Sequence, residues 1–130
     1  MYDSGNEPLQ TVSIAFIGKT VAAVLKKPEQ TANRYVNVVE FETSVNELVK
    51  ISEAVSGSKW TVTHSSSSEE EKIGQEKLAK GDYSAFVNFL RAFFLADGAG
   101  RAPSAMQYDN DILGLKKGDL EAFIKKWIKG

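Results

Sequence analysis

Few residues in this chain could hold a metal ion or act as a nucleophile. His64 is the only histidine, and there is no cysteine. A zinc site is normally built from several His and Cys ligands, and one histidine with carboxylates gives a weak, unspecific site. The composition therefore excludes disulfides, thiol catalysis and zinc–thiolate centres, and we expect no metal site. His64 is typical of an ordinary hydrogen-bonding residue at the end of a strand.

Phosphate-binding glycine patterns are also missing from the sequence. Neither G-x-G-x-x-G nor G-x-x-x-x-G-K-[ST] occurs. The segment 18-GKT-20 resembles the end of the second pattern, but Ser13 stands where its first glycine would be. The glycines of 98-GAG-100 follow a phenylalanine-rich segment rather than a strand, which is the wrong context for a phosphate cradle. We therefore expect no cofactor-binding residues.

Aromatic side chains gather in one short segment, 83-YSAFVNFLRAFF-94. Helical spacing would put Phe86, Leu90, Phe93 and Phe94 on one face, with Phe89 on its flank. Such a face indicates either core packing or one wall of an apolar ligand pocket. On the second interpretation the substrate-binding residues are Tyr83, Phe86, Phe89 and Phe93. Catalytic residues remain unknown; the acid–base candidates for a cofactor-free reaction are His64, Asp82, Tyr83 and Tyr108.

The charge balance argues against polyanionic partners. The 130 residues carry 16 Lys and Arg against 17 Asp and Glu, a formal charge of −1. Such a balance provides no global basic field for nucleic acid or an anionic membrane. No apolar run reaches the ~18 residues of a membrane span, and no secretory signal pattern begins the chain. We expect one cytoplasmic domain covering residues 1–130.

The elements that would position these residues alternate between strands and helices. Strands are predicted over 11–16, 35–41 and 59–64, and the apolar residues of 35–41 do not alternate cleanly, which favours burial of that strand on both faces. Helices are predicted from Ile17 to the stop at Pro28, after a capping box of Ser44 and Glu47, and after a second box of Ser68 and Glu71. Asp82 is expected to cap the aromatic helix, 97–104 is expected to be a loop, and a last helix covers about 120–128.

This order predicts an α/β (or α+β) fold. A small parallel or mixed sheet of about three strands would be packed with four to five helices. The last helix has an apolar face and a lysine face, and we expect it to dock on its own domain rather than lie on a membrane.

Several blocks of the chain resemble one known family. They are 2-YDSGNEP-8, 16-FIGKTVAAVLKKPEQTANRYVNVVEF-41, 44-SVNELVKISEAVSGSKWTV-62, 81-GDYSAFVNFL-90 and 108-YDNDILGLKKGDLEAFIKKWI-128. In this order and spacing they resemble the C-terminal half of fungal NmrA-like proteins, an atypical short-chain dehydrogenase/reductase group that includes isoflavone-reductase-like enzymes. One departure is Phe16, because relatives often carry an acidic residue before the pair corresponding to Ile17 and Gly18.

The resemblance implies that different parts of the protein bind the cofactor and the substrate. In that family the N-terminal part is a Rossmann domain with the glycine-rich NAD(P) loop, and the C-terminal part helps to shape the substrate pocket. The expected function is that of the substrate-binding portion of an NmrA-like NAD(P)-dependent oxidoreductase. The chain would be truncated, would lack the cofactor site and would not be a reductase by itself. NADP would be the cofactor of the full-length relatives. Two alternatives remain: a stand-alone ligand- or protein-binding regulatory module, and a cofactor-independent isomerase or cyclase acting on an apolar metabolite.

The expected partners follow from the same picture. An apolar small molecule would be the ligand. A truncated sheet would leave apolar surface uncovered around Val36, Val38 and Phe41, so we expect a homodimer or a protein partner to cover it.

Overall fold

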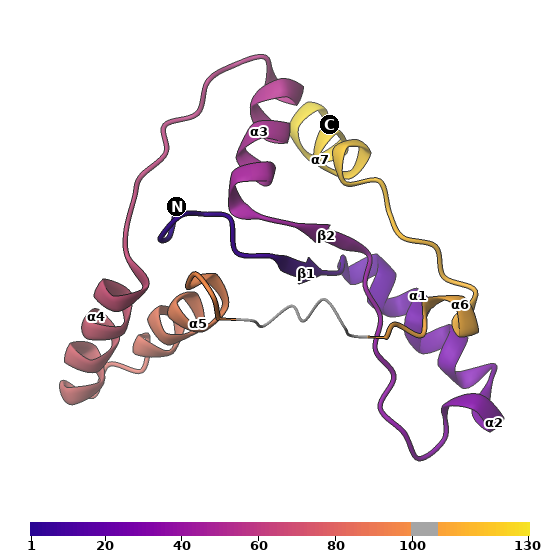
Figure 1. Ribbon diagram of the computed structural model, residues 1–130. Helices are drawn as coiled ribbons and strands as arrows, with labels where there is room; N and C mark the ends of the chain where they lie inside the picture. Colours follow the sequence, from indigo (N-terminus) through magenta and orange to yellow (C-terminus); the bar gives the residue numbers. More distant parts are fainter. Residues whose placement is uncertain (100–106) are drawn as a thin grey trace. The chain divides into compact units, whose positions relative to one another are not determined.

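The computed structural model describes residues 1–99 and 107–130 and is built mainly of helices (Figure 1). The helices are α1 (Ile14–Leu25), α2 (Pro28–Thr31), α3 (Val45–Ser56), α4 (Ser67–Ala79), α5 (Ala85–Leu95), α6 (Asn110–Leu113) and α7 (Leu120–Lys129). The mixed helix-and-strand class is confirmed. The expected number of helices is too low, because the four-residue helices α2 and α6 were not predicted. Residues 100–104 of the predicted loop lie outside the described residues.

The contacts divide the chain into two compact units. Unit 1 comprises Met1–Leu9 and Thr43–Arg101, and unit 2 comprises Gln10–Glu42 and Ala102–Gly130. Unit 1 contains α3, α4 and α5, and unit 2 contains α1, α2, α6 and α7. The single domain expected from the chain length stays a prediction. Among the described residues, no helix combines the length and the apolar character needed to cross a bilayer.

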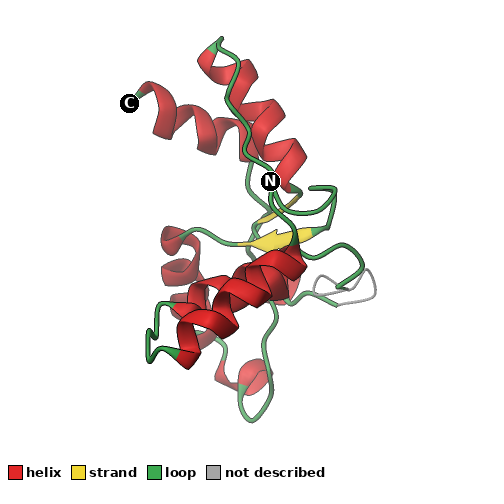
Figure 2. Ribbon diagram, turned by 90° about the vertical axis from the view of Figure 1, so that its left-hand side faces the viewer, coloured by secondary structure: helices red, strands yellow, loops and turns green. Residues whose placement is uncertain are grey.

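The sheet is smaller than predicted. It consists of β1 (Leu9–Thr11) and β2 (Phe41–Thr43), which run in opposite directions (Figure 1). Figure 2 shows how little of the chain these two strands occupy. The prediction of a parallel or mixed sheet of about three strands is therefore wrong.

The first predicted strand, 11–16, is interrupted by a helix cap. The hydroxyl of Ser13 accepts the backbone N–H of Phe16 at 3.1 Å, which starts α1 at Ile14. The backbone N–H of Ser13 donates to the Glu40 carboxylate at 2.7 Å. Both interactions satisfy backbone groups with side chains, so the apolar residues after Ser13 continue as a helix.

The second predicted strand, 35–41, is paired at Asn37 and Val39 with the residues Asp109 and Asn110. The Val39 N–H donates to Asn110 Oδ1 at 3.1 Å, and Asn110 Nδ2 donates to the Val39 carbonyl at 2.7 Å. The preceding Asp109 acts similarly: its carboxylate accepts the Asn37 N–H at 2.9 Å, and its own N–H donates to the Asn37 carbonyl at 2.7 Å. Two consecutive residues thus replace a neighbouring strand along this edge.

This arrangement places the most buried residue of unit 2. Val39 has no exposed surface, and Asn110 is itself buried. The carboxylate of Asp109 also pairs with Arg34. The Arg34 hydrogen bond, with that of the Asn37 amide, lowers the pKa of Asp109.

The third predicted strand, 59–64, has no sheet partner among the described residues. The backbone N–H of Trp60 donates to the Glu53 carboxylate at 3.1 Å instead of to a strand. A single parallel bridge joins Ser65 to Tyr2, just beyond the predicted range.

The helix boundaries follow the sequence more closely. The Ser44 hydroxyl accepts the Glu47 N–H at 3.2 Å, so the predicted cap at Ser44 is confirmed, and Gly57 ends α3 with a φ of 71°. The second box is wrong by two residues, because Ser66 rather than Ser68 caps α4. The Asp3 carboxylate accepts the Ser67 N–H at 2.8 Å, and this extra acceptor selects the start of the helix within the serine run.

The last helix contacts unit 2 through one aromatic pair, and its docking on its own domain stays a prediction. Asp119 caps α7 by accepting the Ala122 N–H at 2.9 Å. The ring of Phe123 lies 5.2 Å from the ring of Phe41, centroid to centroid. A Cβ on Gly118 would lie 2.5 Å from the Phe41 ring, so only glycine allows this approach. Phe41 is therefore buried rather than left uncovered.

Replacing Asn110 with Ala tests this side-chain pairing. The change leaves the buried N–H and carbonyl of Val39 without partners, and we expect the free energy of unfolding to fall by about 2–4 kcal/mol. Urea unfolding followed by circular dichroism measures it. Asp111→Asn, on the exposed side of the same helix, is the matched control and should change stability by less than about 0.5 kcal/mol. Equal effects of the two changes would rule out the pairing as a stabilising interaction.

Candidate functional site

The aromatic residues of α5 do not form a common core. Tyr83 is 83% exposed and Phe86 is 64% exposed, while Leu90, Phe93 and Phe94 are also open to solvent. Core packing of the predicted face is therefore wrong. The packed face consists of Ala85 and Asn88, which are buried, together with Phe89 and Ala92.

Two features hold α5 against α4 in unit 1. The ring of Phe89 lies on Gly74, where a Cβ would come within 2.8 Å of a ring carbon. Beside this contact, buried Asn88 donates to the buried Glu70 carboxylate at 2.7 Å, and Lys77 donates to Asn88 at 3.0 Å. Arg91 adds a charge 3.6 Å from the same carboxylate. A buried carboxylate needs such partners, and here they fix the packing register of the two helices.

A cleft of about 280 Å³ opens beside this contact. It is lined by Glu71, Phe89, Ala92 and Phe93. The structure thus brings two of the four predicted substrate-binding residues to one cleft. Tyr83 and Phe86 do not line it, and the substrate assignment of all four stays a prediction.

The acid–base candidates differ in their surroundings. His64 and Tyr83 are exposed. Asp82 is exposed as well, and its carboxylate accepts the Ser84 N–H at 2.9 Å, which lowers its pKa. Tyr108, in contrast, is partly buried and lines a cleft of unit 2.

The cleft beside Tyr108 is the larger of the two. It measures about 470 Å³ and is lined by Tyr108, Asn110, Asp111, Leu115, Lys116 and Lys117. The Lys117 ammonium lies 5.7 Å from the centre of the Tyr108 ring and pairs with Glu42. A cation over an aromatic face is attracted by the ring quadrupole. The cleft therefore combines an aromatic wall with ammonium groups, which suits a ligand with a ring and a carbonyl or carboxylate group.

The Tyr108 hydroxyl is shielded from solvent. Its oxygen is buried and makes no hydrogen bond of ordinary geometry among the described residues. Burial, reinforced by the Glu42 charge, raises the pKa of Tyr108. The phenol is therefore protonated at neutral pH, and it is suited to donating a proton or hydrogen bond rather than to acting as a base.

Sequence reasoning named Tyr108 but missed the rest of this cleft. The string 108-YDNDILGLKK-117 supplies every lining residue. The signal for this cleft in the sequence was a tyrosine that is followed by Asp and Asn, by a helical turn and by two lysines. What the pattern does not reveal is that Asn110 binds the Val39 backbone and thereby fixes this string in place.

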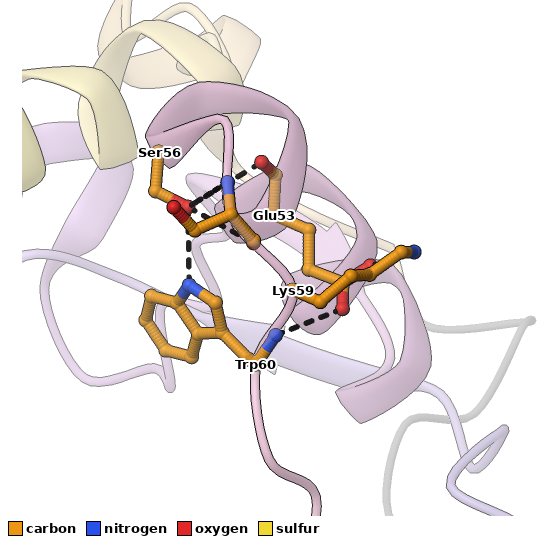
Figure 3. A network of polar contacts seen from close by, with 5 residues as sticks. Glu53, Ser56, Lys59 and Trp60 are labelled. Atoms are coloured by element: carbon orange, nitrogen blue, oxygen red, sulfur yellow. Dashed lines mark hydrogen bonds and ion pairs between the residues drawn. The ribbon is translucent and has the colours of Figure 1, made fainter.

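A third polar cluster lies at the C-terminal end of α3 (Figure 3). The Trp60 indole N–H donates to the Ser56 hydroxyl at 3.1 Å, and Lys59 donates to the Glu53 carboxylate at 2.7 Å. The hydrogen bond from Lys59 lowers the pKa of Glu53. Glu53 and Lys59 also line a shallow cleft of about 360 Å³. Because these polar groups bind one another, the cluster explains the path of the chain after α3 better than it explains a ligand.

Metal binding finds no support in the described ranges. There, no group of three or more His, Asp or Glu side chains is arranged to hold a metal ion.

Two fungal oxidoreductases are similar to this chain. Oxidoreductase poxI of Penicillium oxalicum is 33% identical over 129 residues, which is 97% of this chain and 41% of poxI. Oxidoreductase aprR of Aspergillus flavus is 24% identical over 131 residues, which is 98% of this chain and 43% of aprR. The chain thus spans about two fifths of the length of these relatives. No family model and no solved structure matches the chain.

The shielding of Tyr108 predicts that its phenol loses its proton at a higher pH than an exposed tyrosine does. Because its pKa is raised in the folded state, stability from this group is full below the ordinary value of 10.0 and falls as the pH rises through it. Phenolate absorbance of the folded chain should contain a component above the ordinary value, and Tyr108→Phe should remove it. The control is the same titration in urea. If Tyr108→Phe left the high-pH component of the absorbance in place, the claim that Tyr108 is the shielded phenol would be refuted.

Proposed function

We propose that this chain is the substrate-binding portion of an NmrA-like NAD(P)-dependent oxidoreductase. The observation that carries the proposal is the 33% identity with an oxidoreductase over 97% of the chain. The match with a second fungal oxidoreductase over 98% of the chain points the same way. The five sequence blocks that resemble NmrA-like proteins motivate the finer assignment.

The substrate side of such an enzyme needs an apolar wall and a few polar groups. The cleft beside Phe89 and Phe93 offers the first, and the cleft beside Tyr108 offers an aromatic ring with nearby ammonium groups. The sequence has no glycine-rich phosphate loop. On this proposal the nicotinamide cofactor is bound by other parts of the full-length enzymes, and this chain alone does not reduce a substrate.

A second candidate is a protein-binding regulatory module. It is favoured by the exposed apolar residues of α5, among them Phe86, Leu90 and Phe94. Large apolar side chains gathered on one helix face are typical of a docking surface.

A cofactor-binding measurement tests whether the NADPH site lies outside this chain. Isothermal titration calorimetry of the full chain with NADPH should give no saturable heat, because no loop cradles the pyrophosphate. Saturable binding would contradict the proposal that the cofactor site lies elsewhere.

Substrate-side binding needs a separate measurement with a matched control. The probe is acetophenone, a one-ring aromatic ketone, followed by NMR chemical shifts of the α5 amides. Replacing Phe93 with Ala should weaken binding about two- to tenfold, the loss of one aromatic contact of roughly 0.5–1.5 kcal/mol. Phe86→Ala, on the same helix but outside the cleft, should have no effect. Equal weakening by both changes, or no binding at all, would refute the α5 cleft as a substrate site.

A further inference from the structure

The α5 cleft has a single charged side chain in its lining. This cleft is the space of about 280 Å³ that is lined by Glu71, Phe89, Ala92 and Phe93. Glu71 comes from α4, and the other three residues come from α5. The volume is at the small end of ligand pockets, which span about 300–1,000 Å³. The cleft is therefore of a size for a one-ring compound, and it offers that compound two aromatic rings and one carboxylate.

The packing of α5 on α4 sets the separation of the two walls. Glu71 directly follows Glu70, and Phe89 directly follows Asn88. The hydrogen bond of 2.7 Å from Asn88 to the Glu70 carboxylate therefore lies next to both walls. The ring of Phe89 is also held by its contact with Gly74. The backbone positions from which the carboxylate and the ring project are thus set before a ligand binds.

The negative charge of Glu71 is not neutralised by the chain. Among the described residues its carboxylate makes no hydrogen bond and no ion pair. Glu70, in contrast, has Arg91 at 3.6 Å. Lys72 follows Glu71 directly and so projects about 100° away around the helix. The neighbours on the same helix face, three and four residues away, are uncharged: Ser67, Ser68, Gly74 and Gln75.

A positively charged ligand group would interact favourably with both parts of this lining. An ammonium ion is attracted by a carboxylate and also by the negative face of an aromatic ring. The ring of Phe93, which is 47% exposed, and the ring of Phe89 provide the aromatic part. A neutral aromatic compound gains only the ring contacts, and an anionic one is repelled by Glu71. The lining therefore distinguishes ligands by the sign of their charge.

We propose that the α5 cleft binds a small aromatic amine in its ammonium form. The ring of the amine packs on Phe89 and Phe93, and its ammonium group pairs with Glu71. This inference names a substrate class for the cleft, and it rests on the substrate-side role proposed above. Ion pairs and cation–aromatic contacts at exposed sites are each weak. We therefore expect a dissociation constant on the order of millimolar and a preference of about three- to tenfold over a neutral analogue.

Two probes of the same shape test the requirement for a positive charge. 1-Phenylethylamine and acetophenone share the ring and the length of the side chain, but at neutral pH the amine is a cation and the ketone is uncharged. Both are titrated into the full chain at about 0.15 M salt, which screens distant charges, and NMR chemical shifts of the α5 amides report binding. The amine should bind about three- to tenfold more tightly than the ketone.

A matched pair of variants assigns this preference to Glu71. Glu71→Gln keeps the size of the side chain and removes its charge, so the affinity for the amine should fall about three- to tenfold, to that for acetophenone. Binding of acetophenone itself should not change. Glu69→Gln removes the same charge from the same turn of α4 but outside the lining, and it should alter the affinity for the amine by less than about twofold.

The outcomes separate this inference from the proposed function. Equal affinities for the two probes, or a preference for the amine that survives Glu71→Gln, would overturn the inference and leave the substrate role of the cleft standing. If neither probe shifted the α5 amides, both the inference and the substrate role of the cleft would fall.

Discussion

Unit 2 depends on a side-chain amide that takes the place of a strand. The Asn110 side chain accepts from the N–H of Val39 and donates to its carbonyl, and Asp109 pairs with Asn37 through its carboxylate and its own backbone N–H. Buried backbone groups must find partners, and one of the most compact is a neighbouring peptide-like amide. The segment before β2 is thereby fixed, and Gly118 and Phe123 pack against the ring of Phe41. The same dipeptide follows Tyr108, so the interaction that completes the core also positions one wall of the Tyr108 cleft.

In unit 1 a buried charge, rather than a side-chain amide, fixes the packing. The pair α4 and α5 buries the Glu70 carboxylate, which Asn88 and Arg91 satisfy from the facing helix. Removing one partner of a buried charge costs more than the pair contributes, so such a network specifies one register of the helices. That register sets Phe89 on Gly74 and directs Phe86 and Leu90 outward. The exposed aromatic surface of α5 is thus a consequence of which polar residues the helix buries.

The helices could largely be predicted from the sequence, and the strands could not. Caps such as Ser44 act on groups a few residues away, so the local sequence contains the whole interaction. The β-branched residues of 35–41 indicate a strand, but the partner of Val39 is an asparagine about 70 residues later. Likewise, the helical period found an apolar face on α5 but could not reveal that Asn88 and Ala85 form the buried side. Of the candidate site, Phe89 and Phe93 line one cleft while Tyr83 and Phe86 do not, and the Tyr108 cleft depends on long-range pairing.

Native-state hydrogen exchange at the Val39 amide tests the central claim, that side chains of the 109–110 pair substitute for a strand. If the claim holds, this amide is released only when unit 2 opens, and its protection approaches the full free energy of unfolding. The amide of Tyr35, whose side chain is 94% exposed, provides the internal reference for an open segment. Exchange of Val39 as fast as that of Tyr35 would mean that Asn110 does not hold the segment, and the basis proposed for the core and the Tyr108 cleft would fall with it.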